Sequence, residues 1–215
     1  MSSPESLHII SDVDDVQIKH IETWLNWLNG RIGTSFTETD YQEDMVAMTG
    51  HPEPFMRQVA GEFHASGVLA DADPVDGAVD AIAEITERDV VSDLTSRRKE
   101  SEAATHHSIR RHFGTKISRI CLTGIYDNHP PSVGKTLTKT PMIRTMGGHM
   151  LIDNEKIHAF DAAANGYPAI LFGTYYGPEG YNNLPEGVIH CPTWQDVTDY
   201  GLPLCKEIIP VLQAA

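Results

Sequence analysis

The chain has 215 residues, a formal net charge of −14, and 40% hydrophobic against 21% charged residues. This length and apolar content indicate a folded protein with a sizeable core and exclude an intrinsically disordered chain. The negative charge opposes broad binding to nucleic acid polymers and to anionic membranes, so a phosphorylated ligand would need a local cation. The cysteines, Cys121, Cys191 and Cys205, are too few to indicate a disulfide framework. Without a signal-like segment or an apolar run of membrane-spanning length, we expect a cytoplasmic protein.

Hydrophobic periodicity assigns most of the chain to strands and helices. Short apolar runs predict buried strands at 7–11, 89–95, 117–123, 149–153, 169–172 and 188–190. Apolar residues at three- and four-residue steps predict helices at 17–28, 75–88, 98–113, 142–146, 157–165 and 204–212. The first helix is expected to end near Asn29-Gly30, and the stretch from there to Asp73 contains weakly helical pieces around Met45 and 55–63.

Strands and helices alternate regularly after residue 75. Such alternation predicts parallel strands joined by right-handed crossover helices. The expected fold class is therefore α/β, a Rossmann-like parallel sheet flanked by helices, with a helical insertion after the first strand. In domain terms, we expect an α/β core from residues 1–16 and 75–215, and a helical unit from residues 17–74.

Polar side chains follow several predicted strands at the point where each strand ends. Asp12, Asp14 and Asp15 come directly after the first apolar run, and crowded carboxylates of this kind are typical of a hard-cation site. Thr95-Ser96-Arg97 follows the second strand and Asp153-Asn154 the fourth. Because ligands of open parallel sheets bind beyond the carboxyl ends of the strands, we expect these groups to converge.

These segments resemble, in order, the four motifs of the haloacid dehalogenase-like (HAD) hydrolases. Asp-x-Asp-x-Val at 12–16 is similar to the first motif, and the apolar strand ending in Thr95 is similar to the second. Thr138-Lys139-Thr140 resembles the lysine-bearing third motif, and Asp153-Asn154 stands where the acidic fourth motif belongs. The helical insertion is similar to the small C1-type cap of that superfamily. Asp73-Pro74-Val75-Asp76-Gly77 and the strand after it resemble, less specifically, the cytosolic 5′(3′)-deoxyribonucleotidases.

The resemblance implies a role for each matching residue. Asp12 would be the nucleophile, forming an aspartyl-phosphate, and Asp14 would protonate the leaving oxygen and activate water. Thr95, Ser96 and Lys139 would hold the phosphoryl oxygens, with Lys139 counted among the catalytic residues. The cofactor would be Mg²⁺, with ligands drawn from Asp12, Asp14, Asp153 and Asn154. The implied reaction is hydrolysis of a small phosphorylated metabolite, with a nucleoside monophosphate as the first candidate substrate.

Several alternatives stay open at the level of sequence. Asp153 is favoured over Asn154 as the fourth-motif ligand, and Lys135 rivals Lys139 as the motif lysine. Arg97 is equally consistent with substrate binding and with a solvated position at a helix start. The aromatic residues of the insertion are expected to form its core, although one could instead stack on a nucleobase: Trp24, Trp27, Phe55 and Phe63.

Two other functions also fit the residues. The first is a non-catalytic HAD-like binding or regulatory protein, in which Asn154 marks a decayed metal site. The second is a phosphotransferase or mutase that passes the phosphoryl group to an acceptor other than water. The sequence does not indicate an oligomeric state.

Overall fold

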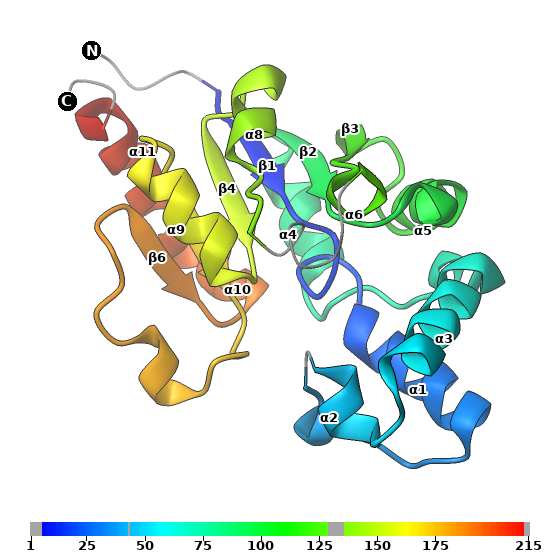
Figure 1. Ribbon diagram of the computed structural model, residues 1–215. Coiled ribbons are helices and arrows are strands. Elements are labelled where there is room, and N and C mark those ends of the chain that lie inside the picture. The colour runs from blue at the N-terminus through cyan, green and yellow to red at the C-terminus, as the bar shows by residue number, and fades with distance from the viewer. Residues whose placement is uncertain (1–5, 43, 129–135, 213–215) are drawn as a thin grey trace.

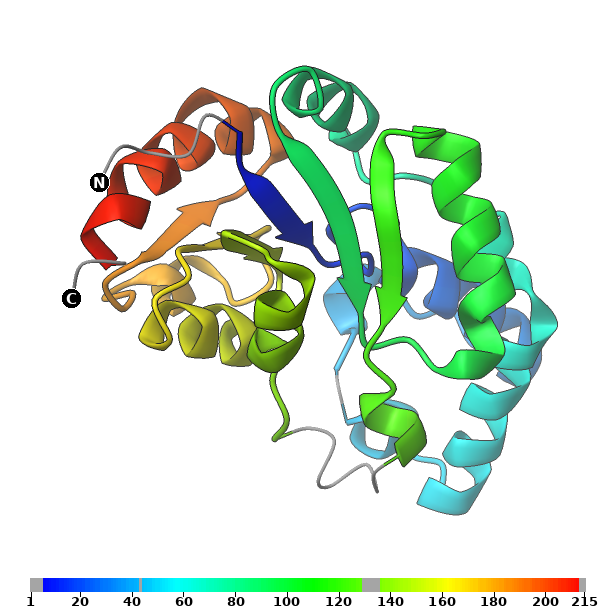
Figure 2. The ribbon, with the colours of Figure 1, turned by 90° about the horizontal axis from the view of Figure 1, so that it is seen from above.

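The computed structural model of the protein describes residues 6–42, 44–128 and 136–212. Its centre is a six-stranded sheet in the order β3-β2-β1-β4-β5-β6 (Figure 2), in which all neighbouring strands are parallel. The strands are β1 (His8–Ser11), β2 (Val90–Thr95), β3 (Ile117–Leu122), β4 (Met150–Asp153), β5 (Ala169–Phe172) and β6 (Val188–Cys191). The predicted fold class, a Rossmann-like parallel sheet flanked by helices, is confirmed. No helix in the described part of the chain is long and apolar enough to span a membrane.

Helices cover both faces of the sheet, because successive residues of each buried strand point to opposite sides. Ile9 and Ile152 pack on one face against α4 (Ala78–Ile85), α5 (Glu102–Phe113) and α11 (Leu202–Leu212). Ile10 and Leu151 pack on the other face against α8 (Thr140–Met146) and α9 (Lys156–Ala164). The remaining segments are η3 (Lys99–Ser101), α6 (Ile125–Asn128), η4 (Pro178–Tyr181), α10 (Trp194–Asp196) and the π-helical η5 (Val197–Gly201).

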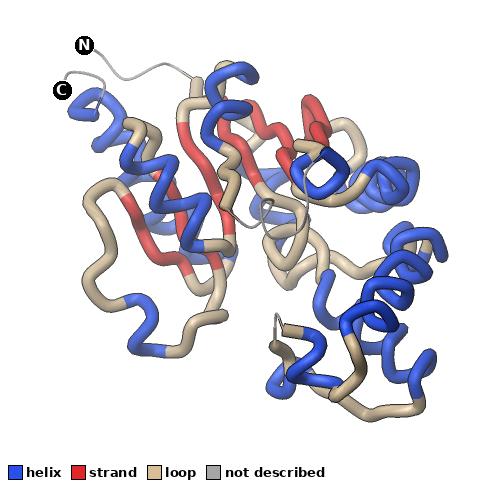
Figure 3. Tube along the Cα trace, viewed as in Figure 1, coloured by secondary structure: helices blue, strands red, loops and turns tan. Residues whose placement is uncertain are grey.

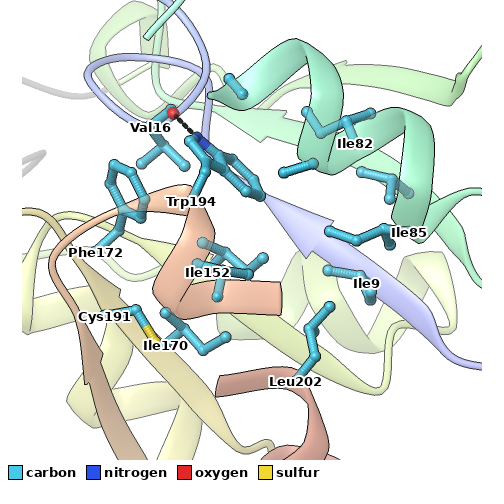
Figure 4. Close-up of a cluster of buried hydrophobic side chains, with 14 of the residues drawn as sticks. Ile9, Val16, Ile82, Ile85, Ile152, Ile170, Phe172, Cys191, Trp194 and Leu202 are labelled. Carbon is cyan, nitrogen blue, oxygen red and sulfur yellow. Dashed lines mark hydrogen bonds between the residues drawn. The ribbon is translucent and has the colours of Figure 1, made fainter. Parts of the chain in front are cut away.

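Trp194 ties the loop after β1 to this core (Figure 4). Its side chain is 1% exposed and packs in the same cluster as Val16, Phe172 and Ile82. The indole Nε1–H donates a hydrogen bond to the carbonyl oxygen of Val16 at 2.7 Å. A buried indole needs such a partner, and the bond fixes the end of the loop that carries the three aspartates.

The chain between β1 and α4 forms a separate group of helices beside the sheet (Figures 1 and 3). They are α1 (His20–Ile32), η1 (Glu38–Asp40), α2 (Met45–Thr49), α3 (Glu53–Ser66) and η2 (Val68–Ala70). These helices share a hydrophobic cluster of their own, with Trp24 6%, Phe63 1% and Leu28 0% exposed. The expectation that Trp24 and Phe63 form the core of this region is thereby confirmed.

Helix boundaries differ from those expected. The predicted helix at 17–28 begins only at His20, because residues 13–18 form a tight loop in which Gln17 and Ile18 both donate to the carbonyl of Val13. It also runs through Gly30 to Ile32, and Gly33 ends it in the left-handed conformation at φ 73°. The helix expected at 75–88 is confined to α4, and the one expected at 98–113 starts with the 3₁₀ turn η3.

Candidate active site

The loop after β1 carries the first site residues. Asp12 is 6% exposed, and its carboxylate Oδ1 accepts the backbone N–H of Val13 at 2.8 Å. The backbone N–H of Asp12 donates in turn to the carbonyl of Ile152 on β4, which anchors the loop beside that strand. Asp12 is therefore held at the carboxyl end of the central strands, where the sequence predicts it.

Lys139 lies between two of the predicted acidic residues. Its Nζ is 2.8 Å from Asp12 Oδ1 and 2.8 Å from Asp153 Oδ2, and its side chain is 1% exposed. Burial raises the pKa of Asp12 to about 6, although the attraction of Lys139 opposes the shift. Burial would lower the pKa of Lys139, but the two carboxylates outweigh it and raise that pKa. The lysine thus stays charged and compensates the acidic pair.

Asp153 and Asn154 have different surroundings. Both carboxylate oxygens of Asp153 are engaged, since Oδ1 accepts the backbone N–H of Glu155 at 2.9 Å and Oδ2 contacts Lys139. Asp153 is 0% exposed, whereas Asn154 is 9% exposed and lines the cavity that contains Asp12. The sequence favours Asp153 as the fourth-motif ligand; these contacts favour Asn154.

Arg97 faces Asp14. Its Nε donates to Asp14 Oδ1 at 2.8 Å, and its Nη1 donates to the hydroxyl of Thr105 at 3.0 Å. Arg97 is 4% exposed, so the alternative of a solvated helix-start arginine is wrong. Burial alone would raise the pKa of Asp14, but the Arg97 guanidinium, His20 and Lys139 together outweigh it and lower that pKa to about 2.

The two predicted phosphate-binding hydroxyls lie next to Arg97. Thr95 is 0% exposed, and its Oγ1 accepts the backbone N–H of Arg97 at 3.2 Å. Ser96 lines the cavity, and its hydroxyl is buried without a hydrogen-bond partner in the described ranges. A buried hydroxyl without a partner suits a ligand that supplies an acceptor.

A cavity of about 580 Å³ lies over these groups. Asp12, Asp14 and Asn154 line it from the sheet side, and His20 and His64 line it from the helices that follow β1. Its size suits a small organic molecule. Burial lowers the pKa of His64 to about 4, so this imidazole is neutral near pH 7.

The predicted metal ligands do not form one cluster of side chains. No group of three or more His, Cys, Asp or Glu side chains placed to hold a metal ion occurs in residues 6–42, 44–128 and 136–212. Asp14 is turned to Arg97, and Asp153 is turned to Lys139. The donors that remain are the Asp12 carboxylate, the Asn154 amide and main-chain carbonyls. This oxygen set fits Mg²⁺, which commonly takes one protein carboxylate and completes its shell with water and phosphate.

One buried polar pair was not predicted. Asp93 on β2 is 0% exposed, and its Oδ1 accepts a hydrogen bond from Gln17 Nε2 at 2.6 Å. Burial raises the pKa of Asp93 to about 8. The only feature of the sequence that pointed to this pair was an aspartate inside an otherwise apolar strand. The rival motif lysine, Lys135, lies outside the described residues.

The sequence matches no known protein-family model and no curated protein. The structure is similar to those of HAD-superfamily hydrolases. A haloacid dehalogenase-like hydrolase from Streptococcus pneumoniae matches 92% of this chain over 99% of its own, with a TM-score of 0.63 and 10% identity. A subfamily IA hydrolase from Geobacter sulfurreducens has a TM-score of 0.58 and 14% sequence identity, and the alignment covers 92% of this chain and 97% of the hydrolase. A Bacillus subtilis HAD hydrolase bound to magnesium has a TM-score of 0.59 and 11% sequence identity, and the alignment covers 90% of this chain and 97% of that hydrolase. The chain therefore has the fold of HAD-superfamily hydrolases.

Proposed function

We propose that the protein is a Mg²⁺-dependent phosphomonoester hydrolase that acts through an aspartyl-phosphate intermediate. The observation that carries the proposal is the position of Lys139, held between Asp153 and Asp12, the latter of which lines the cavity. A buried cation beside a carboxylate and an open cavity suits the binding of a phosphoryl group, whose transfer depends on positioning and charge stabilisation. The fold shared with HAD-superfamily hydrolases supports the same reaction class.

Asp12 would attack the phosphorus atom. A bond forms between its carboxylate oxygen and phosphorus, while the bond from phosphorus to the leaving oxygen breaks. Asp14 would donate a proton to that oxygen and afterwards take one from the water that hydrolyses the aspartyl-phosphate. Its pairing with Arg97 favours the ionised carboxylate, which supports the second role, because an ionised carboxylate can accept a proton. For the first role, Asp14 must take up a proton from solvent before the leaving oxygen departs.

The phosphoryl oxygens would be held by Lys139 and by the hydroxyls of Thr95 and Ser96. The unpartnered hydroxyl of Ser96 supports this assignment. Asp12, Asn154 and the Asp14 main-chain carbonyl would hold Mg²⁺, which supplies charge neutralisation for the phosphate when it is bound. We thus assign the fourth-motif ligand to Asn154, with Asp153 holding Lys139 in place.

The substrate would be a small phosphorylated metabolite, with a nucleoside monophosphate as the first candidate. The division into a core of residues 1–16 and 75–215 and a C1-type cap of residues 17–74 remains part of the proposal, as does the cytoplasmic location. Residues from both parts line the cavity, which supports a cap that contributes to substrate selection.

The nucleophile assignment is tested by Asp12→Asn. This variant should abolish hydrolysis of p-nitrophenyl phosphate in Mg²⁺, because a carboxamide is a far weaker nucleophile than a carboxylate. Asp71→Asn provides a matched control, since the Asp71 side chain is 81% exposed and forms a surface ion pair with Arg111. Full activity in Asp12→Asn would exclude Asp12 as the nucleophile.

The neutral side chain of Asn154 also favours a second candidate function. Without a fourth-motif carboxylate, the protein could be a HAD-like binding protein that retains phosphate ligands and does not turn them over. A panel of phosphate esters and a Mg²⁺ titration separate the two functions: no turnover of any ester, with ester binding retained and no Mg²⁺ binding in calorimetry even beside a phosphate mimic, would favour the binding protein.

A further inference from the structure

Tyrosines from three segments of the described chain line the cavity, Tyr126 of α6 among them, and two of these tyrosines contact each other. Tyr41 lies between η1 and α2, and Tyr175 lies in the loop after β5. Their rings meet edge to face, with centroids 6.3 Å apart and an interplanar angle of 86°. An edge-to-face contact leaves ring surface uncovered, and Tyr175 remains 42% exposed. This tyrosine pair therefore offers aromatic surface to whatever enters the cavity.

The loop that carries Tyr175 is fixed by its next residue. The Tyr176 hydroxyl accepts the backbone N–H of Lys156 at 3.1 Å, and Lys156 Nζ lies 4.2 Å from the centre of the Tyr176 ring. The backbone N–H of Tyr176 donates to the hydroxyl of Tyr181 at 3.1 Å, and the Tyr181 ring stacks on His190 at 3.6 Å. Tyr175 is thus presented from an anchored base, which lowers the entropic cost of stacking on it.

The large aromatic residues buried among the helices after β1 have a different role. Trp24 and Phe63 pack edge to face at 5.0 Å within the buried cluster of the helices after β1. Their burial leaves little surface for a ligand. Of the aromatic residues in that helical region, it is Tyr41 that lines the cavity.

The charges lining the cavity oppose a second anionic group on the substrate. Two guanidinium groups of the described residues line it, those of Arg97 and Arg98, and Arg97 is already paired with Asp14. Four carboxylates line it as well: Asp12, Asp14, Asp15 and Glu155. A leaving group with its own negative charge would meet net repulsion outside the phosphate position. An uncharged leaving group is therefore favoured.

We propose that Tyr175, supported by Tyr41, forms the leaving-group subsite and selects phosphomonoesters whose uncharged leaving group contains a planar aromatic ring. The inference rests on the proposed hydrolase function and deepens it. Base–aromatic stacking tolerates different rings, so the subsite would accept pyrimidine, purine and aryl groups alike. Tyr175 would determine specificity without taking part in bond breaking.

The test compares uridine 5′-monophosphate with ribose 5-phosphate, which lacks the base and otherwise presents the same phosphate ester. In the wild type, kcat/KM should be about tenfold or more higher for the nucleotide, as expected for one stacked ring. Tyr175→Ala should bring the ratio close to one, because it raises KM much more for the nucleotide than for ribose 5-phosphate. Tyr175→Phe, which keeps the ring, should retain the ratio. Tyr41→Ala should reduce it.

Leu204→Ala is the control, because Leu204 is 41% exposed on α11 and does not line the cavity. A wild-type ratio near one, or a ratio that survives Tyr175→Ala, would overturn the proposal. If neither compound is hydrolysed, the hydrolase function fails, and calorimetry with the same two ligands in Mg²⁺ decides the subsite. About tenfold tighter binding of the nucleotide, lost in Tyr175→Ala, would then support it, and equal binding would refute it.

Discussion

Arg97 and Asp14 form an ion pair across 83 positions of the sequence, with Nε and Nη2 of the guanidinium 2.8 Å and 2.7 Å from the same carboxylate oxygen. The arginine side chain is 1% exposed and the aspartate side chain 25%. The pair connects the segment after β2 with the loop after β1. It also fixes the orientation of the carboxylate to which we assign the proton transfers.

Replacing Arg97 should therefore affect both stability and turnover. Arg97→Met leaves a partly buried carboxylate without its partner, and we expect a loss of about 2–3 kcal/mol in the free energy of unfolding, below the 3–5 kcal/mol typical of a fully buried pair. Denaturant unfolding of Arg97→Met, Asp14→Asn and the double variant would measure the coupling. A coupling energy near zero would mean that the ion pair itself does not stabilise the folded protein. Arg97→Lys should recover only part of the loss, because lysine lacks the planar fork.

Lys139 should be more critical than Arg97. Lys139→Met would leave Asp12 and Asp153 buried without their shared cation, and the expected cost is about 3–5 kcal/mol. Asp153→Asn combined with Lys139→Met should recover part of that stability, because one of the two uncompensated charges is removed. Turnover should be lost in Lys139→Met and also in the double variant. Lys116→Met, at an exposed position, serves as the control for a lost lysine.

The sheet could be predicted from short-range patterns, because each strand is a compact apolar run. Parallel strands place their carboxyl ends together, which is how Asp12, Thr95 and Asp153 come to lie at one edge. Lys139 directly precedes α8 and reaches the same edge through its contacts with Asp12 and Asp153. The exact helix ends were missed because a helix tolerates an interior glycine such as Gly30 at a modest cost.

The pairings inside the site could not be predicted from the sequence. Arg97–Asp14 and Gln17–Asp93 join residues 83 and 76 positions apart, and no local periodicity specifies such contacts. The choice between Asp153 and Asn154 likewise depends on the direction of the side chains after β4. Adjacent residues at a strand end face opposite sides, so only the three-dimensional contacts distinguish them.

Asn154 should control the affinity for Mg²⁺. Asn154→Asp adds a carboxylate to an oxygen set that has a single one, and we expect Mg²⁺ to bind about tenfold more tightly, since ligand charge tunes the affinity for hard cations. Asn154→Ala should weaken binding. Calorimetric titration of Mg²⁺ in the presence of inorganic phosphate measures both. A larger effect from Asp153→Asn than from Asn154→Ala would assign the ligand position to Asp153 instead.

Asp93 should make stability depend on pH. Its pKa in the folded state is about 8, against an ordinary value of 3.8, so between these values the folded protein holds a proton that the unfolded chain has released. The contribution of Asp93 to stability therefore falls as pH rises from about 4 to 8, by up to about 1.4 kcal/mol per pH unit. Asp93→Asn mimics the protonated acid and should gain stability relative to the wild type from pH 5 to pH 7.5. An unchanged difference between the two pH values would show that Asp93 is ionised in the folded protein.

Asp15 should anchor the first helix of the insertion. Its Oδ1 accepts the backbone N–H groups of His20 and Ile21 at 2.9 and 3.0 Å, and its own backbone has φ 53°, in the left-handed region. Asp15→Ala removes the acceptor and retains the unfavourable φ, so we expect a loss of about 2 kcal/mol from the missing cap and the strain together. Asp15→Asn keeps an acceptor oxygen and tolerates this φ, and should cost under about 0.5 kcal/mol.

The same variants can be followed at single amides. Hydrogen exchange at His20 and Ile21 should accelerate in Asp15→Ala and stay slow in Asp15→Asn, because these two N–H groups lose their acceptor only in the first variant. Amides in the middle of β4, such as that of Leu151, report global unfolding and provide the internal reference. Equal acceleration at all three positions would mean that Asp15 acts on overall stability and does not hold the start of α1.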